Sequence, residues 1–192
     1  MTAPDSPAVP GNGTDSQPDS RTTGRIDDVP ARWDERTVLT TMLDYARDTV
    51  QAKCAGLSEE HARRAPLPGS PLMTISGIVS HLRWVEYSWI ELMMLGGQED
   101  RAPWTEEDPD REMRIATGIP IATLLADYAA ACARHRELVA PLELDAPSRG
   151  ELGWRAEPVT LRWILLHLIE ETARHNGHLD ILREMADGVT GR

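Results

Sequence analysis

The stretch from residue 160 to residue 188, TLRWILLHLIEETARHNGHLDILREMADG, constrains the fold more than any other. Glu171 and His175 stand four residues apart in its middle, within an apolar stripe, so both side chains are expected on the inward face of a helix. A carboxylate and an imidazole buried there without partners would cost several kcal/mol. We therefore predict that something compensates them, with a metal ion as the first candidate. The stripe has the three- and four-residue spacing of an amphipathic helix: Leu161, Ile164, Leu165, Leu168, Leu179 and Leu182.

Three earlier segments carry the same helical period, over residues 34–54, 74–96 and 120–140. The first two start at Asp or Thr, which are good N-caps, the second stops at a Gly pair, and the third starts at Pro. Between these segments lie irregular stretches, of which residues 98–118 are the most acidic. The sequence shows no strong β-hairpin signal. We therefore predict an all-α fold, a four-helix bundle with long connections.

The first 32 residues are rich in Pro, Gly, Ser, Thr and Asp and contain almost nothing apolar. Such a segment cannot repay its ordering entropy, so residues 1–32 are predicted to be a disordered, flexible N-terminal tail. Residues 33–192 are predicted to form the single bundle domain.

The formal net charge of −11 argues against nucleic-acid partners, because a phosphate backbone needs clustered Lys and Arg. No apolar run reaches the roughly 20 residues that span a bilayer, so no membrane association is expected. The N-terminus has no secretory-signal pattern, and the two cysteines form no disulfide framework. A cytoplasmic protein acting on a small molecule, with a homodimer left open, is the expectation.

His81 lies on the apolar stripe of the second helix, three residues after Ile78. With Glu171 and His175 it would make a three-ligand metal site that leaves coordination positions open. Zinc, nickel, iron and manganese all suit this donor set; zinc is the working expectation. His178 is the next candidate, as a replacement ligand or as a hydrogen-bond partner. The alternatives left open are a hydrogen-bonded core histidine at position 81 and a surface salt bridge between residues 171 and 175.

Other polar and aromatic residues have alternative roles. Glu86, Glu170 and Asp180 are candidates to accept hydrogen bonds from metal-bound imidazoles. The tryptophans of the second and fourth helices either line a cleft or pack the bundle, with packing preferred. Arg83 and Arg174 either hold an anionic thiol cofactor or face solvent. His135 is predicted to pack or to form a hydrogen bond, and Trp104 is predicted to pin its loop to the bundle. His167, one turn before Glu171, is a further residue of interest.

Two segments carry a family resemblance, VSHLRWVEYSW at 79–89 and HLIEETARHNGHLDILRE at 167–184. They resemble the DinB/YfiT-like superfamily, most closely its DUF664 branch, over about residues 33–188. The resemblance implies an up-down-down-up four-helix bundle that holds a divalent metal with one residue of the second helix and two of the fourth. Carried over by position, these residues are His81, Glu171 and His175.

Many members of that superfamily have histidine at both fourth-helix positions, whereas a His/Glu/His set resembles the mycothiol-dependent maleylpyruvate isomerases. That likeness implies metal-dependent activation of mycothiol or another low-molecular-weight thiol, whose thiolate attacks an electrophile. Their extra C-terminal domain and their isomerase reaction are not expected here. A mycothiol-type S-transferase, or another metalloenzyme acting on a small molecule, is the leading hypothesis. The alternative is a non-catalytic dimeric bundle that binds a metal or ligand or serves a stress response; a structural metal in it would have four protein ligands.

Overall fold

A computed structural model of the chain describes residues 33–98, 101–150 and 157–190. The predicted flexible tail, residues 1–32, lies outside the described residues. Within the described ranges the named elements are all helices. An isolated β-bridge pairs Pro147 with Thr160 outside these elements. The helices, in chain order, are α1 (Glu35–Cys54), α2 (Glu59–Arg63), α3 (Ile75–Glu86), the π-helix η2 (Tyr87–Met94), α4 (Arg111–Ala116), α5 (Ile121–Val139) and α6 (Leu161–Asp187).

Side-chain caps set the starts of α1 and α3 at the residues that the sequence predicted, Asp34 and Thr74. Asp34 accepts a hydrogen bond from the backbone N–H of Thr37 at the start of α1, and Thr74 does the same for Gly77 at the start of α3. Thr160 caps α6, which ends at Gly188 with a left-handed φ of 78°. Pro120 is the residue before α5 instead of a member of its first turn.

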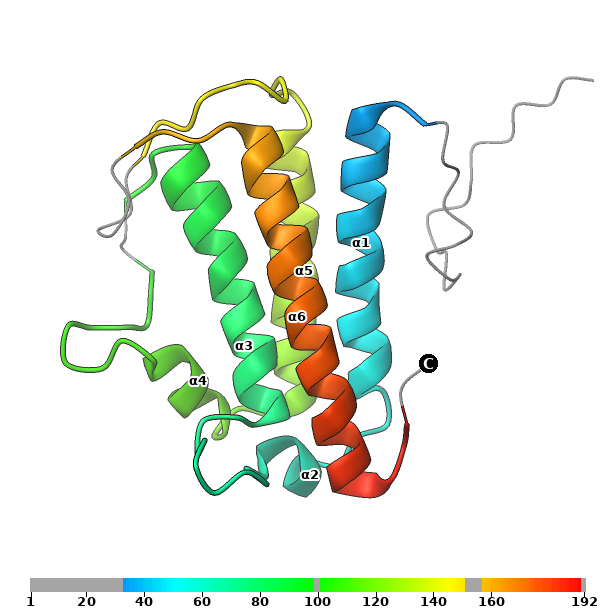
Figure 1. Cartoon of the computed structure of the whole chain (residues 1–192). Coiled ribbons are helices and arrows are strands. Elements are labelled where there is room, and N and C mark those ends of the chain that lie inside the picture. The colour runs from blue at the N-terminus through cyan, green and yellow to red at the C-terminus, as the bar shows by residue number, and fades with distance from the viewer. Residues whose placement is uncertain (1–32, 99–100, 151–156, 191–192) are drawn as a thin grey trace, which may run out of the picture.

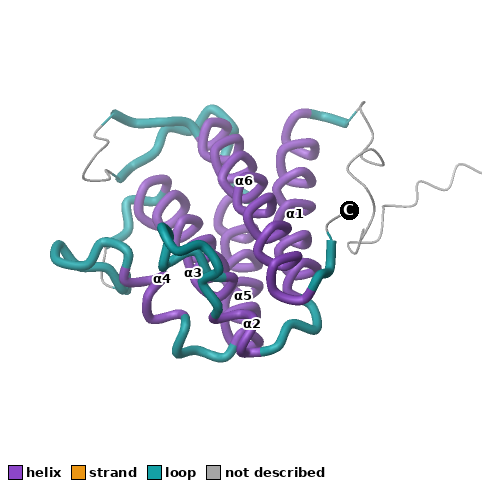
Figure 2. The backbone as a smooth tube through the Cα atoms, turned by 60° about the horizontal axis from the view of Figure 1, so that its bottom comes forward, coloured by secondary structure: helices purple, strands orange, loops and turns teal. Residues whose placement is uncertain are grey.

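Four long helical segments form the bundle, and α3 continues into η2 to make one of them (Figure 1). In Figure 1, α1 and α6 run in one direction and α3 and α5 in the other. The short helices α2 and α4 both contact α3 (Figure 2). They lie in stretches that the sequence read as irregular connections, so that prediction missed them.

The apolar core has two parts along the bundle axis. The lower part includes Leu82 of α3 and Leu179 of α6, and the upper part includes Trp89 of η2 and Leu168 of α6. Along α6, the residues between Leu168 and Leu179 lie at the junction of the two parts. Polar side chains can therefore enter here without interrupting either cluster.

The regular α-helical pattern of the second long segment ends at Glu86, a change that the sequence did not predict. In η2, the backbone N–H of Leu95 donates to the carbonyl of Ile90, five residues earlier. The connection before α6 packs on the end of η2, where the N–H groups of Arg149 and Gly150 donate to the carbonyl of Met93. A Cβ at Gly150 would lie 2.0 Å from the carbonyl oxygen of Leu92, so this close approach requires glycine.

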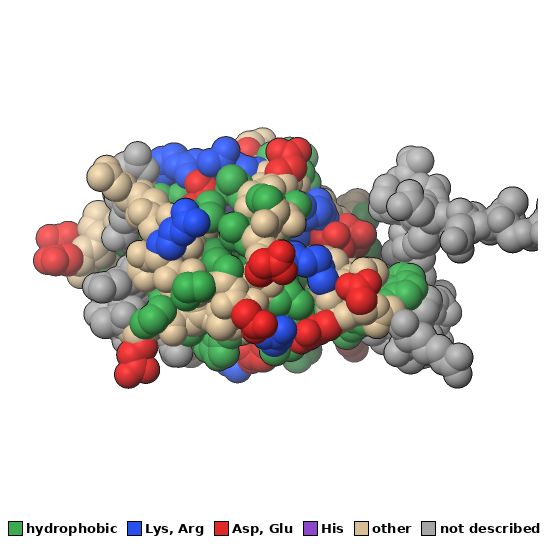
Figure 3. Space-filling model, turned by 90° about the horizontal axis from the view of Figure 1, so that it is seen from above, with side chains coloured by type: hydrophobic (Ala, Val, Ile, Leu, Met, Phe, Trp, Pro, Cys, Tyr) green, Lys and Arg blue, Asp and Glu red, His purple; other side chains and the backbone are tan. Residues whose placement is uncertain are grey.

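The end of the bundle seen from above carries acidic and basic side chains side by side (Figure 3). There Arg162, in the first turn of α6, pairs with Glu35 in the first turn of α1, with 2.6 Å between Nε and Oε1. This pair joins the starts of α6 and α1. None of the described helices combines the length and the apolar character needed to cross a membrane.

Candidate metal centre

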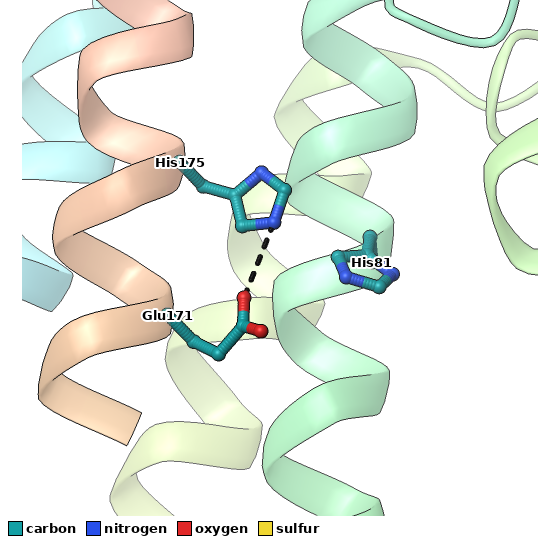
Figure 4. Close-up of side chains that lie close together, drawn as sticks. All are labelled: His81, Glu171 and His175. Atoms are coloured by element: carbon teal, nitrogen blue, oxygen red, sulfur yellow. Dashed lines mark ion pairs between the residues drawn. The ribbon is translucent and has the colours of Figure 1, made fainter. Parts of the chain in front are cut away.

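The three predicted ligands come together between α3 and α6. Each of His81, Glu171 and His175 offers one nitrogen or oxygen atom, and these atoms all lie within 4.8 Å of one another. The imidazole centroids of His81 and His175 are 5.0 Å apart. Figure 4 shows Glu171 and His175 of α6 facing His81 of α3 across the space between the two helices.

The depth predicted for the α6 pair was wrong. The side chains of Glu171 and His175 are 23% and 13% exposed, so they flank the apolar stripe and do not interrupt it. The polar residues that do enter the stripe are Thr172 and Asn176, which are buried. The Asn176 side-chain NH₂ donates to the carbonyl of Ala46 at 2.9 Å, while its Oδ1 is buried without a hydrogen-bond partner among the described residues.

Each imidazole uses its Nδ1 for a contact outside the trio. His81 Nδ1 lies 3.1 Å from Oε1 of Glu112, and His175 Nδ1 lies 3.4 Å from Nδ1 of His178. His178, the next candidate ligand, therefore sits behind His175, and it is not among the three residues whose ligand atoms cluster. Sequence reasoning missed Glu112 because residues 98–118 were read as a solvated loop; the available signal was the short helix-forming run REMRIA.

The carboxylates expected to support the imidazoles lie elsewhere. Glu86 is paired with Arg47, Glu170 is paired with Arg174, and Asp180 forms an ion pair with Lys53. The prediction for these three residues was wrong because Glu86 and Asp180 meet basic side chains of α1, and Glu170 meets Arg174 one turn along its own helix.

The electrostatic balance favours an ionised carboxylate beside the imidazoles. The hydrogen bond from His175 lowers the pKa of Glu171; burial opposes this, and the nearby His175, His167 and His81 reinforce it. Burial lowers the pKa of His178, and the proximity of His175 adds to this. The ionised Glu171 can therefore provide a charged oxygen ligand. The lowered pKa of His178 favours its neutral form, in which one ring nitrogen can accept a hydrogen bond from Nδ1 of His175.

Aromatic side chains flank the trio on both helices. Trp84 packs edge-on against Trp104 with centroids 5.8 Å apart, which agrees with the loop-pinning role preferred for Trp104. On α6, His167 stacks on Trp163 at 5.1 Å and contacts Trp89 at 4.6 Å. Trp89 is buried and Trp163 is 37% exposed, so the packing role holds more strongly for Trp89.

The two arginines considered for an anionic cofactor have protein partners. The Arg83 guanidinium lies 4.6 Å from the Trp84 ring centroid and 3.6 Å from the Asp127 carboxylate. Arg174 forms an i to i+4 pair with Glu170 on the exposed side of α6. These contacts fit the surface-charge alternative better than a cofactor-binding role.

A second group of glutamate and histidine lies next to the trio in sequence but is closed. Glu86 accepts two hydrogen bonds of 2.7 Å from Arg47 and faces Nδ1 of His135 at 2.9 Å. His135 Nε2 lies 3.2 Å from Oε1 of Glu91, so each ring nitrogen of His135 lies within hydrogen-bonding distance of a carboxylate. The hydrogen-bonding role considered for His135 is what the structure shows. Burial raises the thiol pKa of the neighbouring Cys132, which keeps it protonated.

The donor set of the trio suits a divalent cation. Two imidazoles and one ionised carboxylate are common ligands of zinc, iron, nickel and manganese. Both imidazoles have partners at Nδ1, the arrangement usual for metal-bound histidines. The residues therefore fit a three-donor site with coordination positions left for other ligands.

Comparison with known proteins agrees with this picture. A conserved protein from Enterococcus faecalis, known from a crystal structure, superposes with a TM-score of 0.58 at 16% sequence identity, covering 82% of this chain and 99% of that one. At this identity the match shows a shared fold. No curated protein matches the sequence. The family model for mycothiol-S-transferase, of the DinB-like group, matches residues 38–188. Since this match spans most of the 192 residues, the chain belongs to the mycothiol-S-transferase family.

Proposed function

We propose that the chain holds one divalent cation through His81, Glu171 and His175 and uses it to transfer a low-molecular-weight thiol of the mycothiol type to an electrophilic small molecule. The observation that carries this proposal is the convergence of three donor atoms from α3 and α6 within 4.8 Å. The family assignment supports it independently.

The protein groups in this proposal have distinct tasks. The ionised Glu171 contributes the negative charge that a divalent cation needs, and the two imidazoles contribute neutral nitrogen donors. A cation bound here supplies a Lewis acid that favours the thiolate form of a coordinated thiol. Because the three side chains are between 13% and 29% exposed, the site is reachable from solvent by a small thiol and its acceptor.

Zinc is the cation that we propose first. Three protein donors with further positions for water or substrate are typical of catalytic zinc sites, whereas structural zinc sites have four protein ligands. Among the described residues the cluster has three members, and His178 lies behind one of them. This arrangement supports an enzyme over the alternative of a bundle with a structural metal.

The test is a conjugation assay on the zinc-reconstituted chain. Mycothiol, with glutathione and coenzyme A as comparison thiols, is incubated with monochlorobimane, and the fluorescent conjugate is measured. We expect conjugation above the uncatalysed rate that is lost with chelator and in His175→Ala, while the matched surface variant Glu170→Ala keeps it.

Equal rates with and without protein, for all three thiols, would contradict S-transfer to this class of electrophile. Conjugation that is unaffected by chelator and by His175→Ala would contradict the role of the trio. The homodimer that the sequence left open stays a prediction, which sedimentation analysis of the same protein checks.

A further inference from the structure

Glu112 differs from the other acidic residues of its loop. Glu106, Glu107 and Asp110 are exposed, whereas Glu112 is 5% exposed, facing α3 from the second residue of α4. A buried carboxylate is costly unless its environment compensates the charge. The contacts of Glu112 with its neighbours on α3 explain why it is buried.

Two hydrogen bonds hold Glu112 against successive residues of α3. Ser80 Oγ donates to the backbone carbonyl of Glu112 at 2.7 Å, and His81 Nδ1 lies 3.1 Å from Oε1 of the same residue. The second carboxylate oxygen, Oε2, is buried and has no hydrogen-bond partner among the described residues. His81 Nδ1 is thus the side-chain partner that the structure gives to the Glu112 carboxyl group.

The contact decides which nitrogen of His81 is available to a metal. A carboxylate accepts hydrogen bonds, so the Nδ1 of His81 carries the proton and the lone pair is left on Nε2. Figure 4 shows one ring nitrogen of His81 directed toward Glu171 and the other directed away from α6. The ring nitrogen of His81 that does not contact Glu112 is therefore the one that faces α6.

We propose that Glu112 is a positioning residue that fixes His81 as an Nε2 ligand of the metal centre. His175 lacks an equivalent support, because its Nδ1 contacts the imidazole of His178 at 3.4 Å.

The first experiment measures zinc affinity by competition with a chromophoric chelator. Glu112→Ala should raise the Kd for zinc about 10- to 100-fold, the usual cost of losing such a partner. Glu112→Gln, which keeps the shape and one acceptor oxygen, should have a smaller effect, and the exposed Glu106→Gln should have none. Circular dichroism of the metal-free variants confirms that each is folded. Values of Kd within about twofold of wild type for both Glu112 variants would overturn the proposal.

The second experiment reads the imidazole directly in the metal-free protein. Nitrogen-15 NMR of His81 at about pH 8, where histidine is neutral, should show the proton on Nδ1 in the wild type and a mixture of tautomers in Glu112→Ala. A proton on Nε2 in the wild type would overturn the proposal. This inference rests on the proposed metal site, but different results contradict each proposal. Absence of zinc binding in the wild type would contradict the proposed function, and the NMR experiment would still test the role of Glu112.

Discussion

The closed group around Glu86 and the open trio around His81 both combine glutamate with histidine, and Glu86 and His81 lie five residues apart on α3. Glu86 is 1% exposed and its charge is matched by Arg47, which is 5% exposed. Glu171 is 23% exposed and its ion pair is with His175, an imidazole. The charge of Glu86 is thus neutralised by the permanently charged Arg47, whereas the partner of Glu171 is an imidazole.

The difference supports the proposal that the trio, and not the closed group, holds a metal. Burial acts to raise the pKa of Glu86, but Arg47 and then His135 outweigh it and lower the pKa to about 2. The protein therefore meets the cost of this buried charge with its own side chains, and the group serves stability. In the trio, two imidazoles and a carboxylate lie close together and are partly exposed, an arrangement that suits an external cation.

The largest expected effect comes from breaking the closed group. Arg47→Ala would leave Glu86 charged and uncompensated in the core, so the free energy of unfolding should fall by about 3–5 kcal/mol. Urea unfolding measures it. The control Arg174→Ala removes an exposed pair and should leave the free energy of unfolding nearly unchanged. Similar losses in the two variants would remove the distinction between closed and exposed pairs.

Low pH should reduce the stability that the closed group contributes, over a defined pH range. The pKa of Glu86 is about 2 in the folded chain against an ordinary value of 4.5, so its stabilisation is complete above pH 4.5 and is lost as the pH falls toward 2. The loss should amount to about 3 kcal/mol. Urea unfolding at a series of pH values measures it. Glu86→Gln should be less stable at neutral pH and lose less in that window; an unchanged pH profile in this variant would contradict the assignment.

Zinc should stabilise the open trio and leave the closed group unaffected. At a free concentration about 100 times its Kd, zinc should raise the free energy of unfolding by about 2.7 kcal/mol, because it binds the folded chain. The gain should vanish in Glu171→Ala and persist in Glu170→Ala, its exposed neighbour. Thermal unfolding with and without zinc measures it. A gain of equal size in Glu171→Ala would place the bound zinc elsewhere.

The smallest effect is expected from Glu171→Ala without metal. Because its pair with His175 is partly exposed, the free energy of unfolding should change by less than about 1 kcal/mol. Urea unfolding in the presence of chelator measures it. A loss as large as that of Arg47→Ala would show that the trio is a structural group of the same kind as the Glu86 cluster.

The sequence predicted the features that depend on local chemistry. Asp34 and Thr74 cap helices because their side chains reach N–H groups three residues ahead, and helical periodicity predicted His81 and Glu171 on the inward faces of two helices. Periodicity did not place Glu171 at the edge of the stripe, because residues on the flank and at the centre of a helix face have nearly the same spacing.

Features that depend on contacts between distant segments could not be predicted. Glu112 meets His81 because α4 docks on α3, and nothing in the loop composition shows where that helix will lie. The π-helix η2 ends where the backbone N–H groups of Arg149 and Gly150, more than 50 residues away, bond to its last carbonyls. The pairing of Glu86 with Arg47 likewise joins α1 to α3 across the core.

The most direct test of the metal centre is elemental analysis of the purified chain after reconstitution with zinc. The wild type and Glu170→Ala should each retain one zinc per chain, and His81→Ala and Glu171→Ala should retain little or none. Absence of stoichiometric metal in the wild type, or full retention in both trio variants, would contradict the account.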